Sequence, residues 1–396
     1  MIHRHASHQL LLLSSLLVLL LNRSYTVSIP TTTLREYLVQ DGDSDDAGIY
    51  LGMAPAFFGF FGYFGALAGM EDELSSSTID EDEFAPETSL LIEQNILKGV
   101  AGASAGAMAA VMLASGVSPH KGGELVSNIK LSDFADPAGV GGFFKGDRFE
   151  ILMNQFLQSL SPMASNTNST LKLEDALIPV AVSAVNIQPQ IMSPEPSWLE
   201  VLTSPLDFLW STYFPTEKIL SQGSMARAAR ASACFPMLFQ PVGWIDTSTD
   251  STNNDGYSLL IDGGIFDMAG YNGLRETIPR SGSEETKIHV LNLSIGSFLP
   301  APPGPEEVSQ DLNVAVDSVF SLSITGLPFC SPLTMENGPI AIRAARRAIR
   351  ATMDQPISAT TSTFTMNGEE KEQYHYVLEI DASSFIDSTV DEKDVQ

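Results

Sequence analysis

Apolar and polar positions along the chain form blocks that predict strands separated by helices. Apolar blocks of strand character are "ILKGVAGA", "ALIPVAVSAVNI", "YSLLIDGG" and "KIHVLNLSIG". Helical patterns lie between them in "AGAMAAVMLASG", "GDRFEILMNQFLQSL" and "MARAARASACF", and a basic helix over 343–353 precedes a last strand in "QYHYVLEI". Strands that alternate with helices are typical of a layered α/β domain with a mainly parallel sheet, which is the fold class we predict.

The start of the chain has a different pattern from the rest. Residues 10–21 form an apolar run after a basic start, and this run is short for a membrane-spanning helix, which needs roughly 20 apolar residues. We therefore predict a signal peptide over residues 1–27 and a secreted or lumenal protein. The alternative is an uncleaved membrane anchor, because Asn22-Arg23-Ser24 offers no small-x-small cleavage site.

The remaining chain divides by composition into a linker, one domain and a tail. Residues 28–48 predict a solvated acidic linker, 49–390 the domain, and 391–396 a short tail. Within the domain, the acidic stretch 71–90 predicts an exposed surface insertion. The proline-broken stretch 190–222 predicts either a lid that meets lipid or a loop packed on the domain. Its large aromatic residues are Trp198, Phe208, Trp210, Tyr213 and Phe214.

Charge and cysteine content exclude several classes of function. The 396 residues carry a formal net charge of −27, which argues against nucleic acid and against electrostatic docking on anionic lipid. Cys234 and Cys330 either pair in an oxidising compartment or stay buried as thiols. A sequon at Asn168 predicts a glycosylated surface loop, whereas the sequon at Asn292 lies in an apolar strand and is expected to be buried. No cluster of ligand residues indicates a metal, and we expect no cofactor.

The first candidate for chemistry is Ser104 in "GASAG". This Gly-x-Ser-x-Gly pentapeptide follows a predicted strand and precedes a predicted helix, which is the context of a nucleophile elbow. The turn is sharp enough to need small neighbours at Gly102 and Gly106, and it places the hydroxyl beside the positive end of the new helix. The alternative is a small-residue turn without catalytic function.

A serine nucleophile needs a base, and the histidines are poorly placed to supply it. His289 and His375 lie in the middle of predicted strands, and His120 in "SPHKGG" predicts a surface loop. We expect a structural role for all three. A Ser-Asp-His hydrolase that uses His289 or His375 stays as an alternative.

Asp262 is the stronger candidate for the base. It stands at the end of the apolar strand "YSLLID", and Gly263 and Gly264 allow the chain to turn away and leave the carboxylate accessible. A turn-capping aspartate is the alternative, since this role is common at such positions.

Several of these features together resemble the patatin-like phospholipase family. The "GASAG" elbow, "DPAGVGGFFKGDRFEIL", "ARASACFPMLFQPV" and "DGG" follow one another in the family's order, and the resemblance covers roughly residues 49–296. It implies a three-layer α/β/α domain and a catalytic dyad of Ser104 and Asp262 without histidine. Ser104 would attack an ester carbonyl while Asp262 takes its proton, and water would then resolve the acyl-enzyme.

The resemblance also implies a glycine-rich run whose backbone amides hold the oxyanion. The matching stretch "MAPAFFGFFGYFG" departs from that pattern, because Ala54, Pro55 and Ala56 stand where glycines are usual. Pro55 has no N–H to donate. The remaining candidates for the oxyanion hole are the N–H groups of Ala56, Phe57 and Gly59.

The sequence thus predicts a serine esterase that acts as a lipid acyl hydrolase on a phospholipid, galactolipid or glyceride, with transient contact to a lipid interface. A weakly active lipid-binding or storage protein of the same fold is the alternative, supported by the missing glycines. A basic cluster in the predicted helix is expected to pair with carboxylates, or else to face phosphate. It consists of Arg343, Arg346, Arg347 and Arg350.

Overall fold

The computed structural model describes most of the chain between residues 29 and 386. The described ranges are 29–39, 48–75, 88–136, 142–166, 170–187, 215–245, 257–279, 287–296, 301–366 and 368–386. The predicted signal peptide, the sequon at Asn168, the aromatic residues between 198 and 214, and the tail at 391–396 lie outside these ranges and stay predictions. Among the described residues, no helix has both the length and the apolar character needed to cross a membrane.

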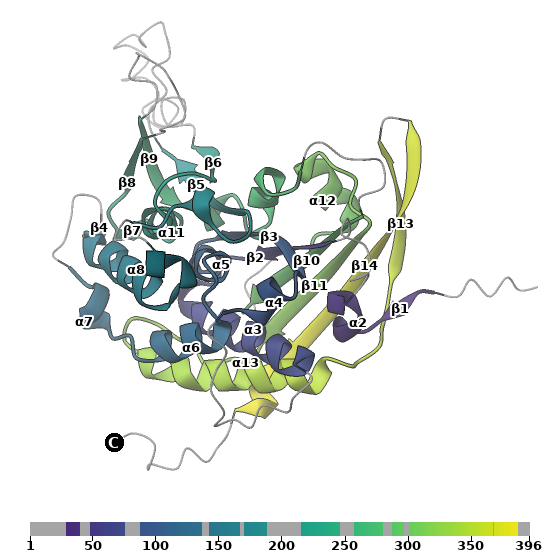
Figure 1. Ribbon diagram of the computed structural model, residues 1–396, viewed down its shortest axis with the longest axis horizontal. Coiled ribbons are helices and arrows are strands. Elements are labelled where there is room, and N and C mark those ends of the chain that lie inside the picture. Colours follow the sequence, from purple (N-terminus) through teal and green to yellow (C-terminus); the bar gives the residue numbers. More distant parts are fainter. Residues whose placement is uncertain are drawn as a thin grey trace, which may run out of the picture.

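A ten-stranded sheet forms the centre of the fold (Figure 1). Its strand order is β13-β14-β11-β10-β2-β3-β5-β9-β8, and β6 pairs with β5. Six neighbouring strands run parallel: β14 (Glu369–Asp381), β11 (Ser318–Thr325), β10 (Ile288–Ile295), β2 (Gly48–Met53), β3 (Leu97–Ala103) and β5 (Val180–Asn186). The antiparallel strands are β13 (Thr360–Met366), β6 (Thr216–Leu220), β9 (Tyr257–Asp262) and β8 (Val242–Ile245).

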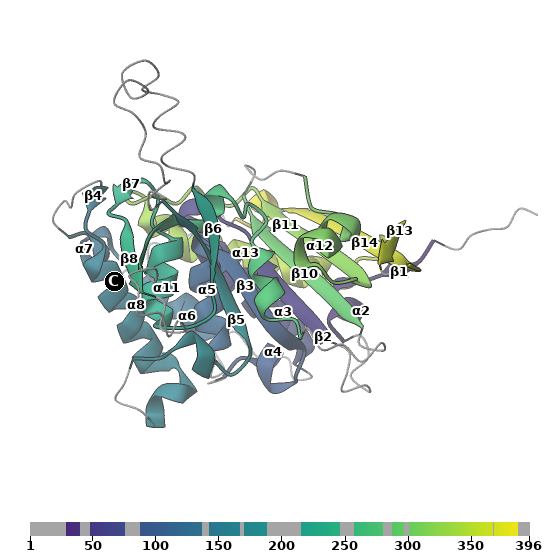
Figure 2. The ribbon, with the colours of Figure 1, turned by 90° about the horizontal axis from the view of Figure 1, so that it is seen from above.

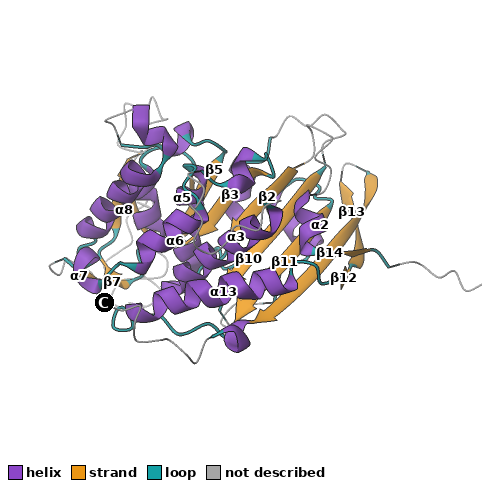
Figure 3. Cartoon of the chain, turned by 60° about the horizontal axis from the view of Figure 1, so that its bottom comes forward, coloured by secondary structure: helices purple, strands orange, loops and turns teal. Residues whose placement is uncertain are grey.

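Helices cover both faces of this sheet and give a three-layer α/β/α arrangement. One layer contains α3 (Phe60–Leu74), α5 (Ala105–Ala114), α6 (Pro119–Ser127) and α13 (Gly338–Thr352) (Figure 3). The other face is covered by α12 (Pro305–Leu312), which Figure 2 shows, and by η6 (Asn272–Glu276), whose Leu274 packs in the same core. Because successive side chains of a strand point to opposite faces, each strand serves two cores. Leu291 and Phe320 pack in the larger core, whereas Val290 and Val319 pack in the smaller one.

The remaining elements surround these layers. The helices are α2 (Leu34–Val39), α4 (Leu90–Glu93), α7 (Leu131–Phe134), α8 (Asp147–Leu160) and α11 (Met225–Ser232). Two small sheets pair β1 (Thr31–Thr32) with β12 (Ile357–Ser358) and β4 (Gly142–Phe144) with β7 (Met237–Phe239). The short 3-10 helices are η1 (Phe57–Gly59), η2 (Pro162–Asn166), η3 (Leu173–Asp175), η5 (Gly263–Ile265), η7 (Met335–Asn337) and η8 (Ala382–Phe385).

The strands and helices predicted from the hydrophobic pattern are present, with shifted boundaries. The basic helix begins at Gly338, before the predicted start at Arg343, and α11 ends at Ser232, before the predicted end near Pro236. Asn292 is buried in β10, as expected for the second sequon. The predicted lid stretch 190–222 is wrong at its C-terminal end, because residues 216–220 form β6 within the sheet.

The prediction of a solvated linker over residues 28–48 is wrong for residues 31–39. These residues form β1 and α2, and Leu34 and Tyr37 of α2 are fully buried. The Tyr37 hydroxyl donates to the backbone carbonyl of Val290, 3.0 Å away. The helix is only 6 residues long, so its apolar face gives little periodic signal in the sequence.

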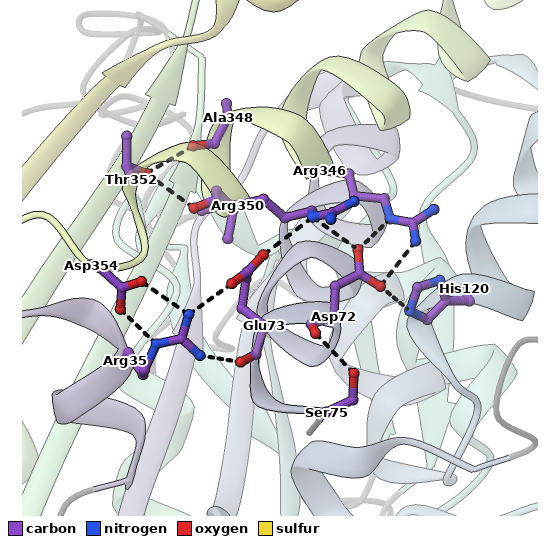
Figure 4. A network of polar contacts seen from close by, with 11 residues as sticks. Arg35, Asp72, Glu73, Ser75, His120, Arg346, Ala348, Arg350, Thr352 and Asp354 are labelled. Atoms are coloured by element: carbon purple, nitrogen blue, oxygen red, sulfur yellow. Dashed lines mark hydrogen bonds and ion pairs between the residues drawn. The ribbon is translucent and has the colours of Figure 1, made fainter. Parts of the chain in front are cut away.

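The prediction of an exposed acidic insertion over 71–90 is wrong for its described ends. Glu71 and Asp72 belong to α3, Glu71 is fully buried, and its carboxylate accepts a hydrogen bond of 2.6 Å from Ser89. Figure 4 shows that Asp72 faces both Arg346 and His120. The Arg346 guanidinium donates to Asp72 over 2.6 and 2.9 Å.

The same cluster shows that the prediction for His120 is wrong, and it provides the partners of two of the arginines. His120 is part of α6 rather than a surface loop, and its side chain is largely buried 3.3 Å from Asp72. Arg350 pairs with Glu73 over 3.3 Å, and Arg35 pairs with Glu73 and with Asp354. The expected pairing of the basic helix with carboxylates is therefore confirmed for Arg346 and Arg350.

Candidate active site

Ser104 lies at the junction of β3 and α5. Its backbone has φ 53° and ψ −118°, a conformation that costs a residue with a side chain on the order of 1–3 kcal/mol. A Cβ atom at Gly102 would lie 2.5 Å from the backbone carbon of Gly106, and one at Gly106 would collide with the Met53 carbonyl. The two glycines are thus required for the turn to fit against the end of β2.

Asp262 lies at the end of β9 and points its carboxylate at Ser104. The Ser104 hydroxyl donates to Oδ2 of Asp262 over 2.8 Å, and the Gly264 N–H donates to Oδ1 over 2.8 Å. A Cβ atom at Gly263 would collide with the carbonyl of Ser183 on β5. The Asp-Gly-Gly turn therefore fits closely against the sheet, and both carboxylate oxygens are fixed.

Burial sets the acid–base properties of this pair. The exposed fractions of Ser104 and Asp262 are 7% and 4%. Burial raises the pKa of Asp262 to about 6, although the hydrogen bonds from Ser104 and Gly264 act in the opposite direction. The carboxylate is still mainly ionised at neutral pH, and it is a stronger base than an ordinary aspartate.

The end of α11 contacts both members of the pair. The Ser104 N–H donates to the hydroxyl of Ser232 over 2.8 Å, and the Asp262 N–H donates to the carbonyl of Cys234 over 3.0 Å. Cys234 is a free, buried thiol, as is Cys330, so the two do not form a disulfide. Burial raises the pKa of Cys234 to about 12, which keeps it protonated and unreactive at neutral pH.

A second buried carboxylate, Asp267, holds the loop that follows the Asp-Gly-Gly turn. It accepts hydrogen bonds from the Ser183 hydroxyl over 2.5 Å and from the N–H groups of Gly270 and Asn272 over 2.7 and 3.2 Å. Burial raises its pKa to about 6. Sequence reasoning missed Asp267, although an aspartate shortly before a glycine is a recognisable turn signal.

The loop after β2 lies against the dyad, where an oxyanion hole is expected. A Cβ atom at Gly264 would lie 2.6 Å from Cβ of Pro55, so this loop packs directly on the Asp-Gly-Gly turn. The Gly59 N–H donates to the carbonyl of Ala56 over 2.6 Å. Gly59 is therefore removed from the predicted oxyanion donors. Ala56 and Phe57 precede this first hydrogen bond of η1, so their N–H groups are not used by it.

The histidines have other partners than the dyad. Nδ1 of His289 lies 2.7 Å from the Ser318 hydroxyl, and Nε2 of His375 lies 3.1 Å from the Ser321 hydroxyl. The Ser104 hydroxyl instead uses Asp262. This arrangement agrees with the structural role expected for them.

Comparison with known protein families finds a match over the part of the chain that contains Ser104 and Asp262. The model of the family described as patatin-like phospholipase matches residues 91–275, which agrees with the resemblance seen in the motifs. A search of curated proteins finds no match.

Two solved structures to which the chain shows similarity are VipD from Legionella pneumophila and the type III effector protein ExoU. VipD is 17% identical, with a TM-score of 0.35, over 65% of this chain and 51% of VipD. ExoU is 12% identical, with a TM-score of 0.35, over 77% of this chain and 53% of ExoU. The alignments span about half the length of each. The match to the patatin-like phospholipase model covers residues 91–275, which include both Ser104 and Asp262.

Proposed function

We propose that this protein is a lipid acyl hydrolase that cleaves fatty acyl esters through an acyl-enzyme on Ser104, with Asp262 as the base. The observation that carries the proposal is the 2.8 Å hydrogen bond from the Ser104 hydroxyl to the buried Asp262 carboxylate, within a region that matches the family. An activated serine needs a base within such a distance.

The reaction follows from the geometry of the pair. Asp262 accepts the Ser104 proton while Oγ bonds to the acyl carbonyl carbon, and the N–H groups of Ala56 and Phe57 would stabilise the oxyanion. Collapse of the tetrahedral intermediate breaks the ester bond, and the alcohol leaves with the proton from Asp262. A water molecule, deprotonated by Asp262, then releases the fatty acid and restores Ser104.

Exposed apolar side chains on the loops around the dyad support a lipid substrate. Phe57 is 62% exposed and its ring lies tilted against that of Phe235, with centroids 4.6 Å apart. Ile265 and Phe266 follow the two glycines of the Asp-Gly-Gly turn, with about half of their surface exposed. Apolar side chains suit acyl chains and transient contact with a lipid interface. Apolar rather than charged contact also agrees with the net charge of −27.

The weakly active lipid-binding or storage protein is the second candidate. The specific observation that favours it is the Gly59 N–H, which is occupied by Ala56 and leaves the oxyanion loop with fewer donors. Loss of one such donor typically costs on the order of 10²–10³ in rate.

Labelling with a fluorophosphonate probe separates these candidates, because the probe reacts with an activated serine. We expect the full chain to be labelled, Ser104→Ala to be unlabelled, and Asp262→Asn to be labelled much more slowly. Ser115→Ala is the matched control, since Ser115 is also a buried serine at an end of α5. Well-folded wild type that stays unlabelled with detergent or lipid present would favour the storage protein. Separate replacement of His289 and His375 should leave the labelling rate unchanged.

A further inference from the structure

A cavity of about 450 Å³ lies next to the candidate active site, and its lining differs from that of an acyl channel. It opens on one face of the sheet at the C-terminal ends of β10, β11 and β14. Polar side chains from these three strands form much of the lining: Asn292, Ser294, Ser321, Ser323, Glu379 and Asp381.

The cavity exists because a helix covers only part of this sheet face. Val290 and Val319 lie near the start of β10 and β11 and pack in the core that α12 completes with Val308 and Leu312. Further along the strands, the positions on the same face become polar. Ser294 of β10 pairs with Ser323 of β11, and Ser323 pairs with Glu379 of β14, so the three side chains form one row across the strands.

The cavity shares its walls with both loops of the dyad. Ala54 lines the cavity, and its carbonyl would lie 2.7 Å from a Cβ atom at Gly106 in the nucleophile turn. Met268 and Ala269 line it from the loop after Asp262. The Asn292 amide donates to the Ala269 carbonyl over 2.6 Å and fixes this loop to β10. The loop after β2 and the loop after Asp262 therefore lie between the cavity and the dyad.

The side chains that line the cavity determine which kind of polar ligand group it can bind. Its side chains offer hydroxyls, an amide and two carboxylates, which can donate to and accept from the hydroxyls of a ligand. The described residues that line the cavity include no lysine or arginine, so a phosphate would face like charge without a cationic partner. They include no aromatic residue either, and a quaternary ammonium is usually held by aromatic rings.

We propose that this cavity binds an uncharged, polyhydroxylated head group of an ester lipid and discriminates against anionic head groups. The inference rests on the proposed function, since it assigns a head-group site to the same reaction. Glu379 is the main determinant of the discrimination. It is exposed at the cavity and continues the serine row, whereas Oδ1 of Asp381 already accepts the Ser383 N–H over 2.9 Å.

The test compares two diacyl lipids with the same acyl chains in neutral detergent micelles, one with a galactose head group and one with an anionic phosphoglycerol head group. The measured quantity is the ratio of their kcat/KM values for the full chain. We expect the wild type to prefer the galactolipid at least tenfold. Glu379→Lys should lower this ratio at least tenfold, mainly through the KM of the anionic lipid, and Glu379→Gln should lower it less.

Glu370→Lys is the matched control, because Glu370 is exposed on the same strand but outside the cavity. Its ratio should stay within twofold of the wild type. Equal ratios for both lipids in a wild type that reacts with fluorophosphonate would overturn the head-group site and leave the proposed function intact. An equal change in Glu370→Lys would also overturn it, since the effect would then come from net charge. Absence of fluorophosphonate labelling would instead overturn the proposed function itself.

Discussion

The raised pKa of Asp262 predicts a specific dependence of activity on pH. Burial places this pKa at about 6, whereas an exposed aspartate has a pKa of about 4. Protonated Asp262 cannot accept the Ser104 proton, so the active fraction of enzyme follows the ionisation of this one carboxyl. We therefore expect kcat/KM to rise with pH and to level off above neutrality.

The size of the effect follows from the ionised fraction. With a pKa of about 6, roughly a tenth of the carboxyls are ionised at pH 5 and roughly nine-tenths at pH 7. We expect kcat/KM to fall about tenfold from pH 7 to pH 5. A carboxyl with a pKa near 4 would give a fall of only about 10% over the same range.

The assay is hydrolysis of a soluble p-nitrophenyl ester between pH 4.5 and 8, with kcat/KM as the readout because it reports ionisations of the free enzyme. Asp267→Asn is the control, since burial also raises the pKa of Asp267 to about 6. The inflection should persist in this variant, whereas Asp262→Asn should lose activity at every pH. A flat profile from pH 5 to 7, or an inflection that disappears in Asp267→Asn, would refute the reasoning.

Three further predictions concern stability, each measured as the free energy of unfolding in denaturant. Gly106→Ala is expected to lose about 1–3 kcal/mol, because the new methyl group would meet the Met53 carbonyl. Gly304→Ala is the control, since its Cβ atom would meet nothing within 4 Å, and equal losses in the two variants would contradict the packing argument. Asp72→Asn should lose about 3–5 kcal/mol, because the buried Asp72 side chain is the partner of Arg346 and His120. The control Asp354→Asn, whose side chain is 68% exposed, should lose less than about 1 kcal/mol. A larger loss in Asp354→Asn than in Asp72→Asn would contradict the argument from burial. Burial raises the pKa of Glu71 to about 7, so the folded protein binds more protons than the unfolded chain between about pH 4.5 and 7, and the free energy of unfolding decreases as pH rises through this window. Glu71→Gln should remove up to about 3 kcal/mol of that decrease, whereas the exposed control Glu93→Gln should leave it unchanged. An unchanged pH dependence in Glu71→Gln would contradict the assignment of this decrease to Glu71.

The parts of the site that were predictable from sequence are those encoded by short local patterns. Ser104 directly follows an apolar strand and Asp262 ends one, and glycines lie within two residues of each, so both turns follow from a few neighbouring residues. The accessible carboxylate expected for Asp262 was not correct, because its exposed fraction is only 4%. The layered fold was predictable for the same reason, because a buried parallel strand is a continuous apolar run. That the two side chains meet came from the family resemblance and not from any local pattern.

The parts that were not predictable depend on distant partners. Glu71 and Asp72 form part of an acidic run, and such runs are usually solvated. Here Arg346 and His120 approach Asp72 from other helices, and this pairing makes burial possible. Gly59 is a comparable case, because its suitability as an oxyanion donor depends on a hydrogen bond to Ala56 that composition does not reveal.

Only part of the chain matches the family model, and this division indicates which segments determine substrate specificity. Residues 91–275 contain both members of the dyad. The loop that follows β2, at 54–57, and the polar row on β10, β11 and β14 lie outside that match. Yet β2 pairs with both β3 and β10 in the middle of the sheet, so these segments belong to one continuous structure. We infer that the matched segment supplies the nucleophile and base, that the loop after β2 supplies the oxyanion donors, and that the strands β10, β11 and β14 select the head group.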